Sequence, residues 1–304
     1  MKKRHLFLFI FFTFLLLFYS GNADYFQVFA FNRDLFRKSA KKIDLKPIGK
    51  IPLIKSPVVQ PYLTAEGVYV VELSTFTPLF ERNLHQKFFP ASTAKIITAL
   101  TAVDLYQPEE IVLINKVVNE GQVMGLVEGE HISFENLLYG LLIHSGNDAA
   151  YAIADFYGYD KFIKLMNQKA QDLKMFNSHF TNPAGLDDQN QYTTPYDLTL
   201  AARALLNNQY LKKIVSIKEI TISDIDYQHF HQLTNVNKLL GEINGIGGLK
   251  TGHTKNAGDN LVSYYRHSND EYIITVLKSL DRFEDTKNLV NWLNSNIIYY
   301  SPED

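Results

Sequence analysis

The sequence contains no cysteine, which excludes disulfide bridges and thiolate metal sites. Its 9 histidines form no H-E-x-x-H pair or similar ligand cluster, so we predict no metal and no other cofactor. A formal net charge of -2 leaves no basic excess for binding nucleic acid, and we predict no such partner. What remains is a chain of 304 residues with 46% hydrophobic residues, enough for one large domain and an extension.

Residues 1–23 are predicted to be a secretory signal peptide or a short membrane anchor. Met1–His5 is positively charged, and Leu6–Tyr19 is almost wholly apolar but shorter than the roughly 20 residues of a spanning helix. Gly21-Asn22-Ala23 fits a cleavage site, whereas the aromatic residues of Tyr25–Phe31 leave an uncleaved anchor open. We therefore expect export to the outer face of the cytoplasmic membrane, periplasmic or extracellular, with membrane attachment through this end as an alternative to cleavage.

Residues 24–61 are predicted to form an extended tether, and residues 62–304 a folded domain without internal repeats. The tether is basic in its first half and then carries prolines at positions 47, 52, 57 and 61. Such a composition is typical of a spacer rather than of a packed domain.

Three short motifs follow in order along the predicted domain: Ser92-Thr93-Ala94-Lys95, Ser145-Gly146-Asn147 and Lys250-Thr251-Gly252. Together they supply a nucleophile with a lysine beside it, a second hydroxyl with an amide, and a lysine–threonine pair for an anionic substrate. That combination suits acyl transfer through a serine ester. Each motif alone is weak, because Ser39-Ala40-Lys41-Lys42 and Ser20-Gly21-Asn22 match the first two patterns by chance.

The surroundings of the first motif predict a helix that starts at the serine. Pro90 suits a first helical turn, and the alanine-rich stretch after it favours helix. Ser92 and Lys95 are then neighbours on one face, near free N–H groups at the helix start. The alternative is a buried helix with a serine and a lysine at its edge.

The other two motifs lie at predicted junctions. Ser133 is a natural N-cap of an apolar helix that ends at Ser145, where polar side chains can point into a cleft. Ordinary capping is the alternative. Glycines around Lys250 allow close approach of a ligand, and the β-rich runs Asn260–Arg266 and Glu271–Leu277 predict a hairpin beside it. The alternative there is a glycine-rich turn with an exposed lysine.

The whole pattern predicts an α+β fold with one central antiparallel sheet and a helical region. Strands come from both ends of the domain, with a strand pair at Gly67–Glu72 and Pro78–Glu81 and further strands after Gly248. Helices are expected at 92–105, 133–143, 148–156, 160–173, 195–206 and 284–296.

Beyond the motifs, the sequence resembles the serine D-alanyl-D-alanine carboxypeptidases, the low-molecular-mass penicillin-binding proteins, over roughly Glu66 to Asn296. The similar stretches are 90–92, 144–150, 166–167, 180–186, 193–197 and 248–254. The resemblance implies a β-lactamase/transpeptidase-like fold for a serine D,D-peptidase catalytic domain at 62–304. It also implies a peptidoglycan stem peptide ending in D-Ala-D-Ala as substrate and β-lactams as inhibitors. Many relatives add a small β-domain and a C-terminal anchor. This sequence ends at Asp304, soon after the last helix expected for the catalytic domain, so we expect any membrane attachment to come from the N-terminus.

The resemblance implies catalytic roles for the first two motifs. Ser92 would become acylated, with Lys95 as its general base. Ser145 would relay a proton to the leaving amine, and Asn147 would hold the substrate amide. The backbone N–H groups of Ser92 and His253 would form the oxyanion hole.

The resemblance also implies a binding site for the terminal carboxylate of the substrate. Lys250 and Thr251 would receive that carboxylate, and Gly252 and His253 belong to the same substrate-binding segment. Arg282 matches an arginine that such enzymes often carry near the carboxylate.

A general base at Lys95 requires an unusual lysine. A free lysine has a pKa of about 10.4, so it is a poor base at neutral pH. We expect partial burial and the Lys250 ammonium to lower the pKa of Lys95, because both disfavour its charged form.

Three rival functions share parts of the pattern. A class A β-lactamase needs a glutamate after the S-x-N element to activate the deacylating water, and the sequence has none between Asn147 and Lys218. A D,D-endopeptidase of the same family would use identical chemistry and differ only in the space beyond the leaving group, so that alternative stays open. The third rival is a peptidoglycan-binding protein without activity, although every expected catalytic residue is present.

Overall fold

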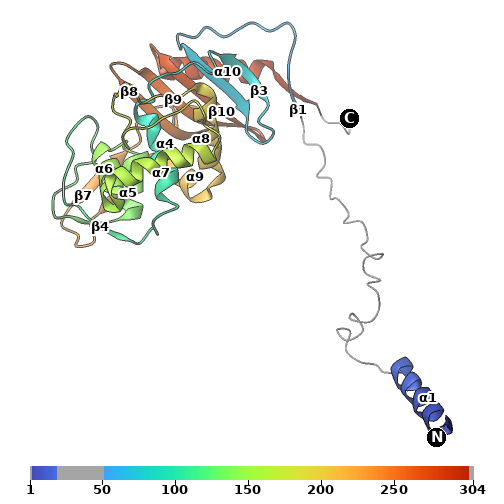
Figure 1. Cartoon of the computed structure of the whole chain (residues 1–304). Coiled ribbons are helices and arrows are strands. Elements are labelled where there is room, and N and C mark those ends of the chain that lie inside the picture. Colours follow the sequence, from blue (N-terminus) through green and yellow to red (C-terminus); the bar gives the residue numbers. More distant parts are fainter. Residues whose placement is uncertain (1, 19–50, 301–304) are drawn as a thin grey trace. The chain divides into compact units, whose positions relative to one another are not determined.

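The computed structural model describes residues 2–18 and 51–300, which belong to two separate units (Figure 1). In the first unit, Lys2–Phe18 forms helix α1. No helix among the described residues combines the length and the apolar character needed to cross a membrane. The predicted cleavage site at 21–23 and residues 24–50 of the predicted tether lie outside the described residues.

Five antiparallel strands form the central sheet of the second unit, in the order β3-β2-β10-β9-β8 (Figure 1). They are β2 (Gly67–Glu72), β3 (Pro78–Arg82), β8 (Ile246–Thr254), β9 (Gly258–His267) and β10 (Asp270–Ser279). This pairing confirms the predicted sheet, the strand pair and the hairpin. Strand β8, which carries the K-T-G motif, lies at one edge of the sheet.

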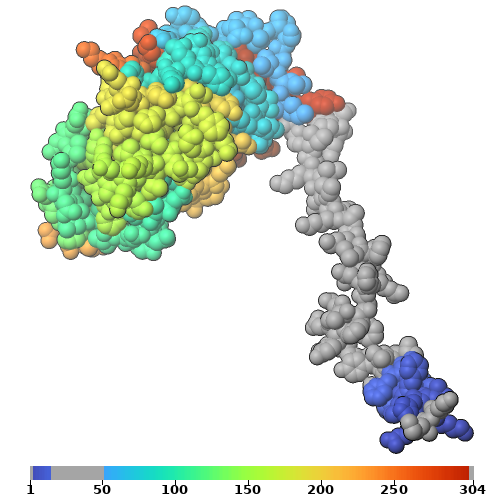
Figure 2. Space-filling view, viewed as in Figure 1, coloured from blue at the N-terminus to red at the C-terminus, as the bar shows by residue number. Residues whose placement is uncertain are grey.

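Helices fill most of the chain between β3 and β8, and one follows the last sheet strand. The 3-10 turn η1 (Ala91–Ala94) precedes α4 (Lys95–Ala102), followed by α5 (Phe134–Leu142), α6 (Asn147–Tyr157), α7 (Tyr159–Asp172), α8 (Pro195–Asn207), α9 (Gln209–Val215) and α10 (Arg282–Asn296). The predicted helices are all present within a few residues of their expected ends, and α9 was not predicted. Figure 2 shows α7 and its neighbours, in yellow-green, on the face turned to the viewer.

Alternating side chains of the sheet reach two different cores. In β2, Tyr69 and Val71 pack into the larger core with α8 and the other central helices, whereas Val68 and Val70 pack into the smaller core with α10. This is the two-residue period of a strand that is covered on both faces. The sheet is therefore a middle layer between the helical region and α10.

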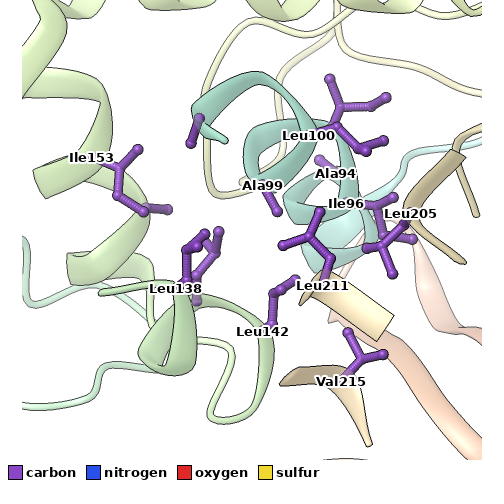
Figure 3. Packing of buried hydrophobic residues seen from close by; sticks show 14 of the residues in the cluster. Ala94, Ile96, Ala99, Leu100, Leu138, Leu142, Ile153, Leu205, Leu211 and Val215 are labelled. Atoms are coloured by element: carbon purple, nitrogen blue, oxygen red, sulfur yellow. The ribbon is translucent and has the colours of Figure 1, made fainter. Parts of the chain in front are cut away.

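Helix α4 lies at the centre of the larger core (Figure 3). Ile96, Ala99 and Leu100 pack in one cluster with Leu138 of α5 and Leu205 of α8. All eight residues of α4 are buried. Its first residue is the lysine of the S-x-x-K motif, so the fold places an amine in surroundings that disfavour charge.

Three two-stranded ribbons complete the unit, and the sequence pattern did not predict them. Strands of three to five residues show too little alternation to be recognised. They are β4 (Ile111–Leu113) with β5 (His131–Ser133), β6 (Glu219–Ser223) with β7 (Phe230–Thr234), and β1 (Ile51–Ile54) with β11 (Ile297–Tyr300). Strand β1 falls within the predicted tether, and its pairing ties that part of the chain to the second unit, upstream of the predicted start at 62.

Candidate active site

The first motif lies where η1 passes into α4. Lys95 Nζ donates a hydrogen bond to Ser92 Oγ at 2.9 Å. Residues three apart on a helix face the same way, which is why the spacing brings the two groups together. The Lys95 side chain is completely buried. A hydroxyl and a buried amine therefore meet with no solvent between them.

Asn147 joins this pair from the start of α6. Lys95 Nζ also donates to Asn147 Oδ1 at 2.7 Å and to the carbonyl of Ala184 at 2.8 Å. The Asn147 amide is oriented by Glu120, because Nδ2 donates to the Glu120 carbonyl at 2.7 Å. The three acceptors of the lysine are neutral oxygens, so no carboxylate is bonded to it to hold its proton.

Ser145 sits between α5 and α6 in a strained backbone conformation. Its φ of 64° lies in the left-handed region, which costs a non-glycine residue about 1 kcal/mol or more. Its Oγ accepts a hydrogen bond from Lys250 Nζ at 2.7 Å, and the same amine donates to the Thr251 carbonyl at 3.0 Å. The strained turn thus aims the serine hydroxyl at the K-T-G strand.

The two lysines have lowered pKa values, and burial is the main cause of both. Burial lowers the pKa of Lys95 to about 7, although the Asp148 carboxylate opposes the shift. Burial also lowers the pKa of Lys250, helped by the charges of Lys95 and Arg282. Repulsion between two ammonium groups is mutual, so the coupling of Lys95 and Lys250 that the sequence predicts is present, with burial as the larger cause at both lysines. With a pKa of about 7, a substantial fraction of the Lys95 amine is neutral at neutral pH.

Strand β8 packs closely against η1, and Gly252 permits the approach. A Cβ on Gly252 would lie 3.0 Å from Ser92 N and 3.0 Å from the Ala91 side chain, so a larger residue would push the strand away. Asn260 of β9 ties the sheet to the chain before η1, donating to the carbonyls of Phe89 and Pro90 at 2.9 and 3.0 Å. The turn that carries Ser92 and the K-T-G strand are thereby held together.

Arg282, the first residue of α10, lies beside the K-T-G strand. Its Nη1 donates to the Gly252 carbonyl at 2.7 Å and to Asp259 Oδ1 at 3.3 Å. His253 Nδ1 lies 2.7 Å from the same Asp259 oxygen. Thr251 is buried in the same strand, directly before Gly252. The structure therefore groups all five residues predicted for substrate binding, with Arg282 bonded to the strand backbone.

Asp148, to which the sequence pattern assigned no role, is buried at the start of α6, directly after Asn147. Its two carboxylate oxygens accept hydrogen bonds from the backbone N–H groups of Met124, Gly125 and Leu126 at 2.9, 2.9 and 3.1 Å. The loop that these bonds hold also supplies the Glu120 carbonyl to Asn147. The sequence signal that could have identified Asp148 is its position as an acidic residue directly after the S-x-N motif.

A second buried contact holds this loop from its far side. His231 Nε2 of β7 lies 2.7 Å from Glu130 Oε1, and both side chains are almost fully buried. The other Glu130 oxygen accepts a bond from Val127 N at 2.9 Å. The hydrogen bond to Glu130 raises the pKa of His231 against the effect of burial. We call residues 120–131 together with β7 the rim.

Among the described residues, no three His, Cys, Asp or Glu side chains are arranged as metal ligands would be. The site brings together the Lys95 amine, the Ser145 and Thr251 hydroxyls, the Asn147 amide, and the basic side chains of Lys250 and Arg282. This set can activate a hydroxyl, bind an anionic end group and protonate a leaving amine.

A family model described as D-alanyl-D-alanine carboxypeptidase matches residues 55–280. D-alanyl-D-alanine carboxypeptidase DacF of Bacillus subtilis is 30% identical over 221 residues, covering 70% of this chain and 57% of its own length. DacD of Escherichia coli is 30% identical over 265 residues, covering 81% and 66%. The chain therefore spans between a half and two thirds of the length of these curated relatives.

Solved structures give the same result for the fold. The Streptomyces K15 DD-transpeptidase aligns with a TM-score of 0.74 at 30% identity, covering 78% of this chain and 100% of that one. A D-alanyl-D-alanine carboxypeptidase of Mycobacterium tuberculosis aligns with a TM-score of 0.73 at 26% identity, covering 80% and 96%. These neighbours confirm the predicted transpeptidase-like fold with its central antiparallel sheet.

Proposed function

Because the chain belongs to the D-alanyl-D-alanine carboxypeptidase family, we propose that it removes the terminal D-alanine of peptidoglycan stem peptides through an acyl-enzyme on Ser92. One observation carries the proposal. The Ser92 hydroxyl is bonded to the buried amine of Lys95, whose pKa is lowered to about 7. A serine is a weak nucleophile until a base takes its proton, and this base is in contact and uncharged in part at neutral pH.

Acylation would begin with proton transfer from Ser92 Oγ to Lys95 Nζ. The oxygen then attacks the carbonyl carbon of the penultimate D-alanine, and the negative charge develops on the carbonyl oxygen. The N–H groups of Ser92 and His253 are assigned to that oxygen, and each such donor typically lowers the barrier by about 3 kcal/mol. Asn147 keeps one N–H of its amide for the substrate, since the other is bonded to Glu120.

Departure of D-alanine requires a proton on its amine. Ser145 would give its proton to the leaving amine and recover one from Lys250, which donates to it in the structure. Lys250, Thr251 and Arg282 provide hydrogen bonds and positive charge for the terminal carboxylate. Before deacylation, Lys95 would release the Ser92 proton and Lys250 would regain one through solvent. Lys95 would then take a proton from the attacking water and return it to Ser92 Oγ as the ester bond breaks.

We propose that β-lactams are trapped as long-lived esters of Ser92. The chain has no glutamate between Asn147 and Lys218 to activate a deacylating water. Intact-protein mass after exposure to penicillin, with peptide mapping, should place one adduct on Ser92, and Ser92→Ala should remove it. Rapid turnover of nitrocefin, or an adduct that persists in the Ser92→Ala variant, would overturn the proposal.

The D,D-endopeptidase alternative uses the same residues and stays open. Mass spectrometry of products from pentapeptide monomers and from cross-linked dimers separates the two activities. We expect release of free D-alanine from the monomers to be the faster reaction. Faster cleavage of the dimers would assign the endopeptidase function instead.

We propose the same exported location that the sequence predicts, with residues 1–23 as a signal peptide or anchor. The pairing of β1 with β11 supports a catalytic unit that begins at residue 51 rather than at 62. The tether would then comprise 24–50. N-terminal sequencing of the protein from cell fractions decides between cleavage after Ala23 and an intact anchor.

A further inference from the structure

Asp259 lies beside the segment assigned to the substrate's carboxylate, although the sequence pattern gave it no role. The register of β8 and β9 sets it directly opposite His253, and residues directly opposite each other share a face of the sheet. Thr251 shares that face, because it precedes His253 by two residues. Leu261, opposite Thr251, packs into the smaller core with α10. Asp259 is therefore on the face from which Arg282, at the start of α10, approaches the K-T-G strand.

One carboxylate oxygen of Asp259 holds two side chains of the site. Oδ1 accepts a hydrogen bond from Arg282 Nη1 at 3.3 Å and lies 2.7 Å from His253 Nδ1. The Arg282 side chain is 12% exposed, that of Asp259 25% and that of His253 64%. The carboxylate thus lies between a largely buried guanidinium and a ring at the surface. It restrains the ring of the residue whose backbone N–H is proposed for the oxyanion.

The guanidinium of Arg282 is anchored at one end and has donors left over. Nη1 makes both of its contacts, with Asp259 and with the Gly252 carbonyl. Nε is buried and has no hydrogen-bond partner in the described part of the chain. A guanidinium carries five N–H donors in a planar fork, so Nη2 can bind an anion while the Nη1 contacts persist. Asp259 therefore fixes the guanidinium without using up its donors.

The charge of Arg282 acts on the site, and the charge of Asp259 opposes it. Burial is the main cause of the lowered pKa of Lys250, and the charge of Arg282 adds to it. Burial also lowers the pKa of Arg282, and Asp259 is the strongest of the groups that oppose this shift. Asp281 opposes it less, and its carboxylate caps α10 through two backbone N–H groups. The cation nearest to the K-T-G backbone is thus partly compensated by a bonded anion.

We propose that Asp259 sets the charge selectivity of the carboxylate subsite, by which we mean Lys250, Thr251 and Arg282. It holds Arg282 against the K-T-G strand and opposes its charge, so a free terminal carboxylate is attracted less strongly than it would be without Asp259. The subsite then binds that carboxylate through hydrogen-bond geometry more than through net charge. This inference rests on the proposed function, because it concerns the same substrate at the same site.

Asp259→Asn tests the charge alone, because it keeps an oxygen that Arg282 and His253 can both bond. The probes are a peptide ending in D-Ala-D-Ala and the same peptide with a C-terminal amide, which lacks the charge. We expect the ratio of kcat/KM for the acid to kcat/KM for the amide to rise about three- to tenfold, because one of two like charges at the same guanidinium is removed. The kcat for the acid should stay within about twofold, since the change acts on binding. A merely structural role would change kcat/KM for both peptides by the same factor, which would overturn the proposal.

Further variants locate the effect. Asp281→Asn removes the same charge next to Arg282 and keeps an oxygen for the helix cap, so the ratio should change by less than about twofold. Arg282→Gln should lower the ratio, and adding Asp259→Asn to it should return the ratio toward the parent value, because the two charges oppose each other. A rise in Asp281→Asn equal to that in Asp259→Asn overturns the proposal. Asp259→Ser, neutral and smaller, should also raise the ratio, so the test does not depend on the folding of one variant.

Benzylpenicillin and its methyl ester give the same comparison without peptide hydrolysis, because only the acid carries a free carboxylate. Intact mass against time measures the rate at which each acylates Ser92, and Asp259→Asn should raise the ratio of acid to ester about three- to tenfold. Failure of the parent protein to release D-alanine would refute the proposed function. An unchanged or lower ratio of acid to ester in Asp259→Asn would instead refute the role of Asp259.

Discussion

Two regions of the second unit bury basic side chains, and the pKa values of these side chains are shifted in opposite directions. At the site, Lys95 and Lys250 are bonded to hydroxyl, amide and carbonyl oxygens, and their pKa values are lowered. At the rim, His231 is bonded to the Glu130 carboxylate, and its pKa is raised. A carboxylate partner holds the proton for structure, whereas neutral oxygen partners leave the amine able to lose it for chemistry.

Asp148 shows how closely the two arrangements approach each other. Its charge acts on Lys95 and raises that pKa, but its oxygens are bonded to four backbone N–H groups, three of them in the loop, instead of the amine. The carboxylate thus supports the loop and moderates the lysine without pairing with it. The predictions below change one side of this comparison at a time, in order of expected effect on acylation.

Replacing Lys95 with methionine should remove the site's base and leave the apolar packing. We expect penicillin acylation of Ser92 to fall by at least about 10³-fold, because methionine cannot accept the proton. In the parent protein the acylation rate should rise with pH through about 7, as the amine loses its charge. Stopped-flow acylation across pH measures both effects.

Lys95→Met, although slower in acylation, should be more stable than the parent protein at neutral pH. The lysine has a pKa of 10.5 unfolded and about 7 folded, so the unfolded chain holds the extra proton between these values. Parent stability therefore rises with pH over this window, by a total on the order of 5 kcal/mol. Urea unfolding at pH 7 and at pH 10 gives the free energy of unfolding at each pH. The increase between the two should be smaller in Lys95→Met than in the exposed control Lys164→Met. Equal slopes would contradict the assignment.

Asp148→Asn should disturb both the rim and the lysine. A single amide oxygen leaves at least one loop N–H unpaired, which costs about 1–3 kcal/mol of unfolding free energy. Movement of the loop that orients Asn147 should lower the maximal acylation rate roughly ten- to hundredfold. Loss of the carboxylate charge should move the acylation midpoint to lower pH, since that charge raises the Lys95 pKa. Asp155→Asn on the same helix is the control, and a midpoint moved upward would refute the account.

Gly252→Ala tests the close approach of β8 to η1. The added Cβ would meet Ser92 N and Ala91 at 3.0 Å, so the strand must shift by a few tenths of an ångström. We expect acylation to be about tenfold slower, because the N–H of Ser92 is one of the two proposed donors to the oxyanion. The melting temperature should change little, which would separate misplacement from unfolding. Acylation at the parent rate would show that the contact is not needed.

His231→Gln should affect stability more than acylation. A raised folded pKa means that the ion pair stabilises fully below the unfolded pKa of about 6.5 and loses its effect as pH rises through the folded value. The variant should therefore be less stable by about 2 kcal/mol at acidic pH, with a smaller difference above it. Thermal unfolding from pH 5 to 9 measures this, with the exposed His131→Gln as control. If the loss of stability in His231→Gln grew as pH rises, the raised pKa of His231 would be contradicted.

Local patterns were enough to predict the sheet, most helices and the contact of Lys95 with Ser92. Pro90 and the three-residue spacing fix that contact within one turn of helix, so no distant information is required. The Ala184 and Glu120 carbonyls could not be assigned in the same way, because a backbone oxygen has no sequence identity. Their positions depend on loops that the tertiary fold brings together. The left-handed turn at Ser145 is likewise set by its neighbours, since the residue itself disfavours it.

The position of β8 at the sheet edge has a consequence for what can enter the site. One side of its backbone has no strand partner within the part of the chain that the structure describes, beside the K-T-G residues. A linear chain end could align along that open side and add itself as a further strand, main chain to main chain. A segment that is already paired or packed within a folded protein cannot align in this way. Selection against folded segments would then arise from geometry alone, before any side chain is recognised.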